Sequence, residues 1–187
     1  MTREELELAV QQGEVIAEID CTGRDYSGLK LTGTVFSGVD LSNVRFADAS
    51  LDDCTFHQCR LAGADFSGAS LESGIVNDSA LSGASFKNCR LSNTEFINCR
   101  VDQADFSSAT LAGGGFNDCV IHGAKFPGAD LTFSSFVNSD LKQVTLAEAN
   151  LERTRPLAAA DALTALLPAA SQAEDGDVAR AVRELLA

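Results

Sequence analysis

Residues 61–71 read Leu-Ala-Gly-Ala-Asp-Phe-Ser-Gly-Ala-Ser-Leu, with large apolar side chains at the first, sixth and eleventh positions. The same spacing continues in both directions without a break, from Tyr26 to Leu151, which makes (151 − 26)/5 + 1 = 26 units. An α-helix would scatter this period around its circumference, and a strand would place successive members on opposite faces. A chain that turns a corner every five residues directs all of them inward and can stack turn on turn. The sequence therefore predicts a solenoid.

A second set of positions lies two residues before each large one and holds small side chains, such as Ala64 and Ala69. Residues two apart share one face of an extended segment, so each small residue is expected to enter the interior with the large residue that follows it. Ten of the eleven Phe residues lie in the large positions, and Phe133 does not. The predicted structural core is built on Phe36, Phe46, Phe56, Phe66, Phe86, Phe96, Phe106, Phe116, Phe126 and Phe136.

The repeated unit, as in Ala64-Asp65-Phe66, resembles that of the pentapeptide-repeat family, and the resemblance covers about 130 of the 187 residues. It implies an all-β fold, a right-handed quadrilateral β-helix (solenoid) with four pentapeptides per coil and short α-helical caps at both ends. Positions twenty residues apart would then stack on one face. Because Phe and Leu units alternate, two opposite faces would be lined by Phe and the other two mainly by Leu.

Residues 1–23 are predicted to form the N-terminal cap. Thr2 and Glu5 make a capping-box pattern at the start of a short helix, and Gly13 is a plausible stop for it. A lead-in strand is expected at residues 15–19. Stacked coils leave open backbone edges at their ends, which such a cap would cover. Apolar surface for its packing would come from Leu6, Leu8 and Val10, and the interior phase would begin at Ile16 and Cys21.

The repeat region is predicted to span residues 24–155, and residues 156–187 follow it as helical segments that Pro168 separates. Two roles are open for this C-terminal part. It would either cap the last coil or form a dimer interface, since related members of the pentapeptide-repeat family pair through their C-terminal ends. The candidate dimerisation residues are Leu163, Leu166, Leu167, Val178, Val182, Leu185 and Leu186.

The chain carries 27 acidic and 14 basic residues, a net charge of −13. Direct binding of nucleic acid is not expected, because phosphate contacts need clustered Lys and Arg. The acidity gathers at the ends: residues 1–23 carry six acidic groups and one basic group, and residues 156–187 carry five and two. We find no apolar run long enough to cross a membrane and no secretory leader, so a cytoplasmic location is expected, in a bacterium if the family's usual distribution holds.

Six cysteines and two histidines raise the question of a metal or redox site. His57 and His122 directly follow large inward residues and are expected to face water, so they would not converge with inward thiols on a tetrahedral zinc site. The sequence has no phosphate-binding loop and no nucleophile motif, and we expect neither a cofactor nor catalysis. A free thiol at the small inward position packs as a small apolar group. The cysteines at that position are Cys54, Cys59, Cys89, Cys99 and Cys119.

Function would then lie on the outer faces, each built from residues twenty apart. One face, formed by residues 35–38 and their equivalents in the following coils, has no Lys or Arg. It combines acidic groups with outward aliphatic ones, which suits contact with another protein. The alternative is the preference of exposed strands for Val and Ile, which needs no partner. The candidate binding residues are Val35, Ile75, Asp78, Glu95, Ile97, Asp118 and Val137.

Three functions remain open. The first is a non-catalytic interaction scaffold or adaptor; the N-terminal block from Thr2 to Leu29 resembles pentapeptide-repeat modules of bacterial type VI secretion, which implies a secretion component as partner. The second is DNA mimicry, as in family members that bind DNA gyrase or topoisomerase IV and protect against quinolones. The third is a purely structural spacer. Basic residues would interrupt any phosphate-like stripe, and they include Arg45, Arg60, Lys87, Arg90, Arg100 and Lys125.

Overall fold

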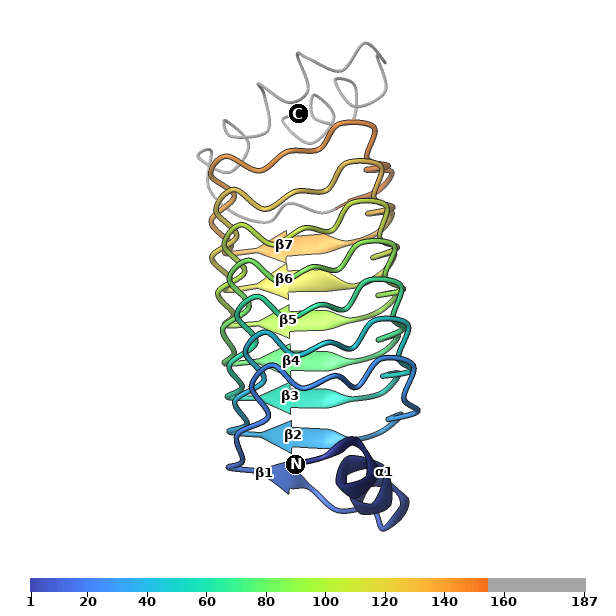
Figure 1. Ribbon diagram of the computed structural model, residues 1–187. Helices are drawn as coiled ribbons and strands as arrows, with labels where there is room; N and C mark the ends of the chain where they lie inside the picture. The colour runs from blue at the N-terminus through green and yellow to red at the C-terminus, as the bar shows by residue number, and fades with distance from the viewer. Residues whose placement is uncertain (155–187) are drawn as a thin grey trace.

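The computed structural model describes residues 1–154, which form a solenoid of stacked parallel coils (Figure 1). Its strands make one sheet in the order of the chain, with one strand per coil. A single helix of the described part, α1 (Arg3–Gln11), lies at the N-terminal end of the rod. The strands are β1 (Ile16–Ala17), β2 (Val35–Ser37), β3 (Thr55–His57), β4 (Ile75–Asn77), β5 (Glu95–Ile97), β6 (Gly115–Asn117) and β7 (Ser135–Val137).

Each coil has four sides. On one side the strands pair in parallel with a register of twenty residues, as in Phe36 opposite Phe56. On the other three sides, single backbone bridges keep the same register, as between Asp40 and Arg60. The backbone hydrogen bonds therefore run along the rod axis, between coils about 4.8 Å apart. The predicted four-sided β-solenoid is confirmed.

Two columns of stacked Phe rings on opposite sides of the coil form the centre of the core. The rings of Phe86 and Phe106 lie 4.8 Å apart between centroids and within 2° of parallel. Across the interior, Phe96 meets Phe106 edge to face, with centroids 6.0 Å apart and planes at 86°, a geometry that the ring quadrupoles favour. All ten predicted core Phe residues are buried. Val76 interrupts one column between Phe56 and Phe96.

Every corner contains a residue with positive φ, two positions after the large apolar residue. Gly, Asn and Asp adopt this left-handed conformation at low cost, which explains why they are common there. Phe133, with a φ of 58°, is a bulky exception, and its ring lies 5.3 Å from the Arg153 guanidinium. The regular return of the left-handed residue turns the chain through a quarter of a coil every five residues.

The N-terminal helix begins and ends as predicted, but the set of side chains that it buries differs from the prediction. The predicted capping box is present, and Gly13 adopts a φ of 70° just after the helix. α1 buries Leu6 and Ala9, which lie three residues apart on one side of the helix. The expectation that Leu8 packs inward is wrong, because it points to the other side and is 54% exposed. The lead-in strand is also shorter than expected, since β1 contains two residues. α1 is too short and too polar to cross a membrane.

Truncating a central ring should cost far more stability than truncating an exposed one. Phe86→Ala removes a fully buried ring from its stack, and we expect the free energy of unfolding to fall by about 3 to 5 kcal/mol. Phe133→Ala is the matched control because Phe133 is 54% exposed, so its loss should stay within about 0.5 kcal/mol. Urea unfolding of the two variants measures the difference. Equal losses would contradict the place of Phe86 in the core.

Candidate protein-binding face

The acidic-aliphatic face is the side of the rod that carries β2 to β7. The first and third residues of each strand point outward, because side chains alternate along a strand. All seven residues predicted to bind a partner lie on this face, and none of its residues is Lys or Arg. We define the face as residues 35–38, 55–58, 75–78, 95–98, 115–118 and 135–138.

The middle of this face exposes two isoleucines. Ile75 of β4 is 44% exposed and Ile97 of β5 is 38% exposed. Ile75 stands opposite Glu95 and Ile97 stands opposite Asn77, so the two isoleucines are diagonal neighbours on adjacent strands. Both lie among the most exposed large apolar side chains of residues 1–154. They therefore form a small apolar patch in the middle of this face.

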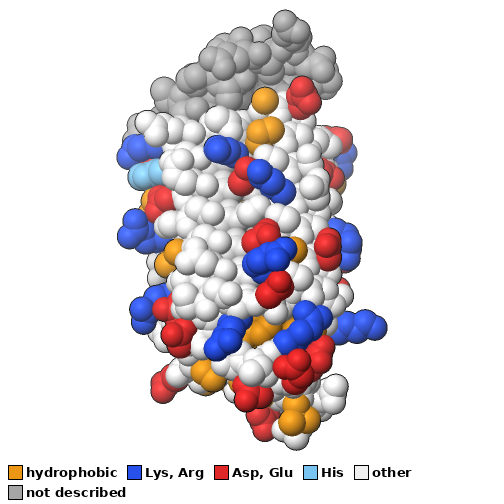
Figure 2. Space-filling view, viewed as in Figure 1, with side chains coloured by type: hydrophobic (Ala, Val, Ile, Leu, Met, Phe, Trp, Pro, Cys, Tyr) orange, Lys and Arg blue, Asp and Glu red, His pale blue; other side chains and the backbone are white. Residues whose placement is uncertain are grey.

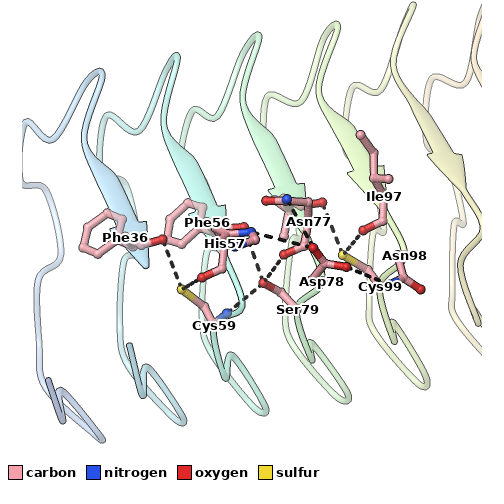
Figure 3. Close-up of polar contacts among 11 residues, drawn as sticks. Phe36, Phe56, His57, Cys59, Asn77, Asp78, Ser79, Ile97, Asn98 and Cys99 are labelled. Carbon is pink, nitrogen blue, oxygen red and sulfur yellow. Dashed lines mark hydrogen bonds and ion pairs between the residues drawn. The ribbon is translucent and has the colours of Figure 1, made fainter. Parts of the chain in front are cut away.

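Two aspartates beside this patch are held by amides from the next coil. Asn98 Nδ2 donates to Asp78 Oδ1 at 2.7 Å, and His57 Nδ1 lies 3.7 Å from Asp78 Oδ2 (Figure 3). Asn138 Nδ2 donates to Asp118 Oδ1 at 3.2 Å in the same way. The two asparagines were not among the predicted site residues, although each follows its aspartate by twenty residues. These bonds fix the direction of the carboxylates and leave them exposed to a partner.

Glu95 is the partly buried acidic residue of this face. Its Oε2 accepts a hydrogen bond from Asn117 Nδ2 at 2.9 Å, and its side chain lies against Gly115. A Cβ at Gly115 would lie 3.4 Å from this Oε2 and would collide with the Ser135 hydroxyl, so a side chain there would disturb both neighbours. Burial raises the pKa of the Glu95 carboxyl above its usual value of 4.5, and the bond from Asn117 partly opposes this shift.

The titration of Glu95 should reflect these two causes. We expect its NMR titration midpoint above 4.5, and a further rise in Asn117→Ala, which removes the opposing hydrogen bond. A pKa raised in the folded state means that the stability linked to the proton is present at low pH and lost as pH rises through the folded-state pKa. Glu95→Gln should therefore gain stability over the native chain near neutral pH but not below 4.5. A midpoint below 4.5 would contradict the burial of this carboxyl.

The corner that follows each of the strands β3 to β7 is closed by a column of Cys and Ser side chains, whereas Val39 follows β2. At the other three corners, the N–H of the small inward residue donates to the carbonyl three residues earlier. Here the Cys59 N–H donates to Ser79 Oγ at 3.0 Å, and Ser79 Oγ donates to the Asn77 carbonyl at 2.9 Å (Figure 3). The Cys99 N–H reaches Cys119 Sγ at 3.4 Å. These residues fill the core as predicted, and they also satisfy the corner backbone, which the sequence did not indicate.

Removing one hydroxyl from this column tests that role. Ser79→Ala leaves the buried N–H of Cys59 without its acceptor, and we expect a loss of about 1 to 3 kcal/mol in the free energy of unfolding. Ser79→Cys should lose less, because a thiol, Cys119 Sγ, serves as the equivalent acceptor two coils further along. Denaturant unfolding of the two variants gives the comparison. If alanine is tolerated as well as cysteine, the hydrogen bond contributes nothing measurable.

The thiols are buried and unpaired with one another. All six cysteines are free, and each is at most 2% exposed. Burial raises the pKa of the Cys54 thiol to about 12 and also raises the pKa of Cys59 and Cys89. A protonated, enclosed thiol is a poor nucleophile and a poor metal ligand. Within residues 1–154, no three His, Cys, Asp or Glu side chains are arranged to hold a metal ion.

The basic residues of the described coils lie on the other three sides, mostly beside acidic ones. Arg45 Nη1 lies 3.0 Å from Asp25 Oδ2, and Lys87 Nζ lies 3.3 Å from Asp105 Oδ2. Blue and red side chains accordingly alternate along the rod in Figure 2. Exposed pairs of this kind contribute little to stability. They do divide the surface into small patches of both signs, in contrast to the acidic-aliphatic face.

The predicted dimerisation residues, from Leu163 to Leu186, lie outside the residues that the structure describes. The predicted boundary between the repeat region and the C-terminal cap, at residue 155, lies at the limit of the described part.

The repeat and its fold place this chain in a known class. Family models match it over residues 77–146, as a pentapeptide repeat region, and over residues 30–74, as pentapeptide repeats in nine copies. The chain belongs to the pentapeptide-repeat family. No curated protein matched it.

Solved structures similar to the chain include other pentapeptide-repeat proteins. A trypsin-treated form of QnrB1, a plasmid-mediated fluoroquinolone resistance protein, is 21% identical, with 76% of this chain and 91% of that chain covered and a TM-score of 0.47. HetL, a pentapeptide-repeat protein involved in heterocyst differentiation regulation in the cyanobacterium Nostoc, is 19% identical, with 82% and 94% covered and a TM-score of 0.31. A thylakoid-lumen pentapeptide-repeat protein of Arabidopsis thaliana is 19% identical, with 72% and 69% covered and a TM-score of 0.30.

Proposed function

We propose that this chain is a non-catalytic protein-interaction module that binds its partner through the acidic-aliphatic face. The observation that carries the proposal is the exposure of Ile75 and Ile97 at the centre of a flat face that bears Asp78, Glu95 and Asp118 and no basic residue. An apolar centre with a polar rim is the usual composition of a protein interface.

The partner must recognise side chains on this face, not its backbone. In the middle of the rod, the strands on either side satisfy the backbone groups of each strand, as β4 and β6 do for β5. An added strand would find no free edge there. Binding would come from apolar side chains packed on the two isoleucines and from Lys or Arg placed beside the ordered aspartates. Opposite charge across the interface would speed association and exclude acidic competitors.

Two partner classes follow from the resemblances of the sequence, a component of bacterial type VI secretion and a type II topoisomerase. Mimicry of DNA finds less support in the charge pattern, because Arg45 and Lys87 on another side stand beside carboxylates and break the acidic surface into short runs. We therefore place the adaptor role first and treat topoisomerase binding as an alternative.

Loss of the apolar patch should abolish binding without loss of the fold. The tagged full chain is used to capture proteins from an extract of the source organism, and purified DNA gyrase is assayed for supercoiling in parallel. We expect the double variant Ile75→Ser, Ile97→Ser to weaken saturable capture at least about tenfold, since each isoleucine contributes roughly 1.5 kcal/mol or more when buried. Phe133→Ser is the matched control, because it removes an exposed apolar side chain from a different side.

The outcomes separate the candidates. Capture that is equal in the isoleucine variant and the native chain would overturn the choice of this face. Inhibition of gyrase by the native chain, lost in the isoleucine variant, would identify the partner as a type II topoisomerase. Absence of any effect on gyrase at large molar excess would remove mimicry, and absence of any saturable partner would favour a structural spacer.

A further inference from the structure

The N-terminal end of the rod carries an unpaired sheet edge. β1 pairs with β2 on one side, and among residues 1–154 no strand lies beyond it. The N–H and C=O groups of successive strand residues point to alternate sides. Since the Glu18 N–H donates toward β2, to the Ser37 carbonyl at 3.0 Å, the backbone groups of Val15 and Ala17 must point away from β2, off the end of the sheet. They form a short row of free donors and acceptors.

α1 does not cover this edge. It packs beneath the opposite side of the first coil, where Arg3 Nη1 donates to the Ser27 carbonyl at 2.8 Å and the Tyr26 hydroxyl donates to the Met1 carbonyl at 2.9 Å. In Figure 1, α1 and β1 lie on different sides of the end of the rod. Proteins usually cover or interrupt an exposed edge, because an edge is a template for another strand. The edge of β1 is open in the described part of the chain.

The side chains around this edge are apolar and acidic. Val15 is 58% exposed, and Glu14 and Glu18 are exposed on either side of β1. Residues 1–23 carry six acidic groups and one basic group. Acidic and hydrophobic side chains accordingly occur together at the N-terminal end of the rod in Figure 2. A ligand that completes this end of the sheet must therefore be extended and positively charged.

We propose that β1 is a docking site for an extended basic segment of another protein, which adds one strand to the end of the sheet. Its main chain bonds to Val15 and Ala17, and its central residue lies in register with Ile16. Lys or Arg two residues to either side of that central residue pair with Glu14 and Glu18. A second copy of this chain is a poor occupant, because it would bring the same six acidic groups and one basic group to the contact. The site is separate from the acidic-aliphatic face and does not depend on the function proposed for it.

A synthetic peptide with the pattern Lys-Thr-Val-Thr-Lys, blocked at both ends, tests the proposal by calorimetric titration into the full chain. An otherwise identical peptide with Glu in place of Lys is the charge control. We expect the basic peptide to bind at least about tenfold more tightly than the acidic one. Bound peptide should also slow hydrogen exchange of the Val15 and Ala17 amides, a readout that nonspecific ion pairing would not produce.

Two variants separate the backbone contribution from the charge contribution. Ala17→Pro removes an outward N–H that makes no bond within the fold, as edge strands tolerate, and should weaken the basic peptide at least about tenfold. Glu18→Lys should weaken it severalfold, whereas Glu148→Lys should not change it. The last variant is a matched control, because Glu148 is also an exposed glutamate with positive φ, near the other end of the described rod.

Several results would overturn the proposal. They are no binding of the basic peptide at about 1 mM, equal affinity for the acidic peptide, or unchanged affinity in both Ala17→Pro and Glu18→Lys. A dimer in sedimentation that Glu18→Lys strengthens would name a second copy as the occupant instead. Should Ala17→Pro fail to fold, the Glu18→Lys and Glu148→Lys pair and the hydrogen-exchange readout decide the question without it.

Discussion

Hydrogen bonding along the rod axis is the constraint on which the rest of this structure depends. Each coil satisfies its backbone through the coils before and after it, and the register of twenty residues is the same on all four sides. Side chains are therefore arranged in columns and must suit their neighbours one coil away. Phe stacks on Phe at about 4.8 Å, close to the separation of the coils themselves. The geometry of the backbone and the geometry of ring stacking thus favour the same spacing, which lets a narrow core of two facing Phe columns exclude water along its whole length.

Most of the architecture could be predicted from the sequence, because the five-residue spacing of its large apolar residues determines the twenty-residue register between coils. Large residues at every fifth position, from Tyr26 to Leu151, admit few other solutions, and Gly, Asn or Asp at the left-handed corner positions agrees with the same coil. The packing of α1 at the N-terminal end of the rod could not be predicted in the same way. Leu8 and Ala9 differ little in their suitability for the helix, and only its placement against the first coil decides that Ala9 is buried and Leu8 is not.

The residues of the candidate binding face could be predicted from the sequence, but the hydrogen bonds among them could not. Residues twenty positions apart in the sequence lie on the same face, so the residues of the face could be assigned by their spacing. The direction of each carboxylate depends instead on the rotamers of the neighbouring side chains. The bond from Asn117 to Glu95 spans 22 residues and crosses from one outward column to the other, so no column count reveals it. The role of Ser79 was hidden for a similar reason. Its hydroxyl is needed because one corner of four lacks the usual backbone bond, a difference in turn geometry that the five-residue repeat does not record.

The fixed register also sets how such a chain can change in length. An insertion of one five-residue unit would advance all later residues by a quarter of a coil, so Phe columns would continue as Leu columns and the acidic-aliphatic face would divide between two sides. An insertion of four units would restore every column and only lengthen the rod by about 4.8 Å. Growth in steps of twenty residues is consequently the one change in length that keeps both the interior columns and the surface columns in register. Such a rod can therefore be lengthened or shortened only by complete coils.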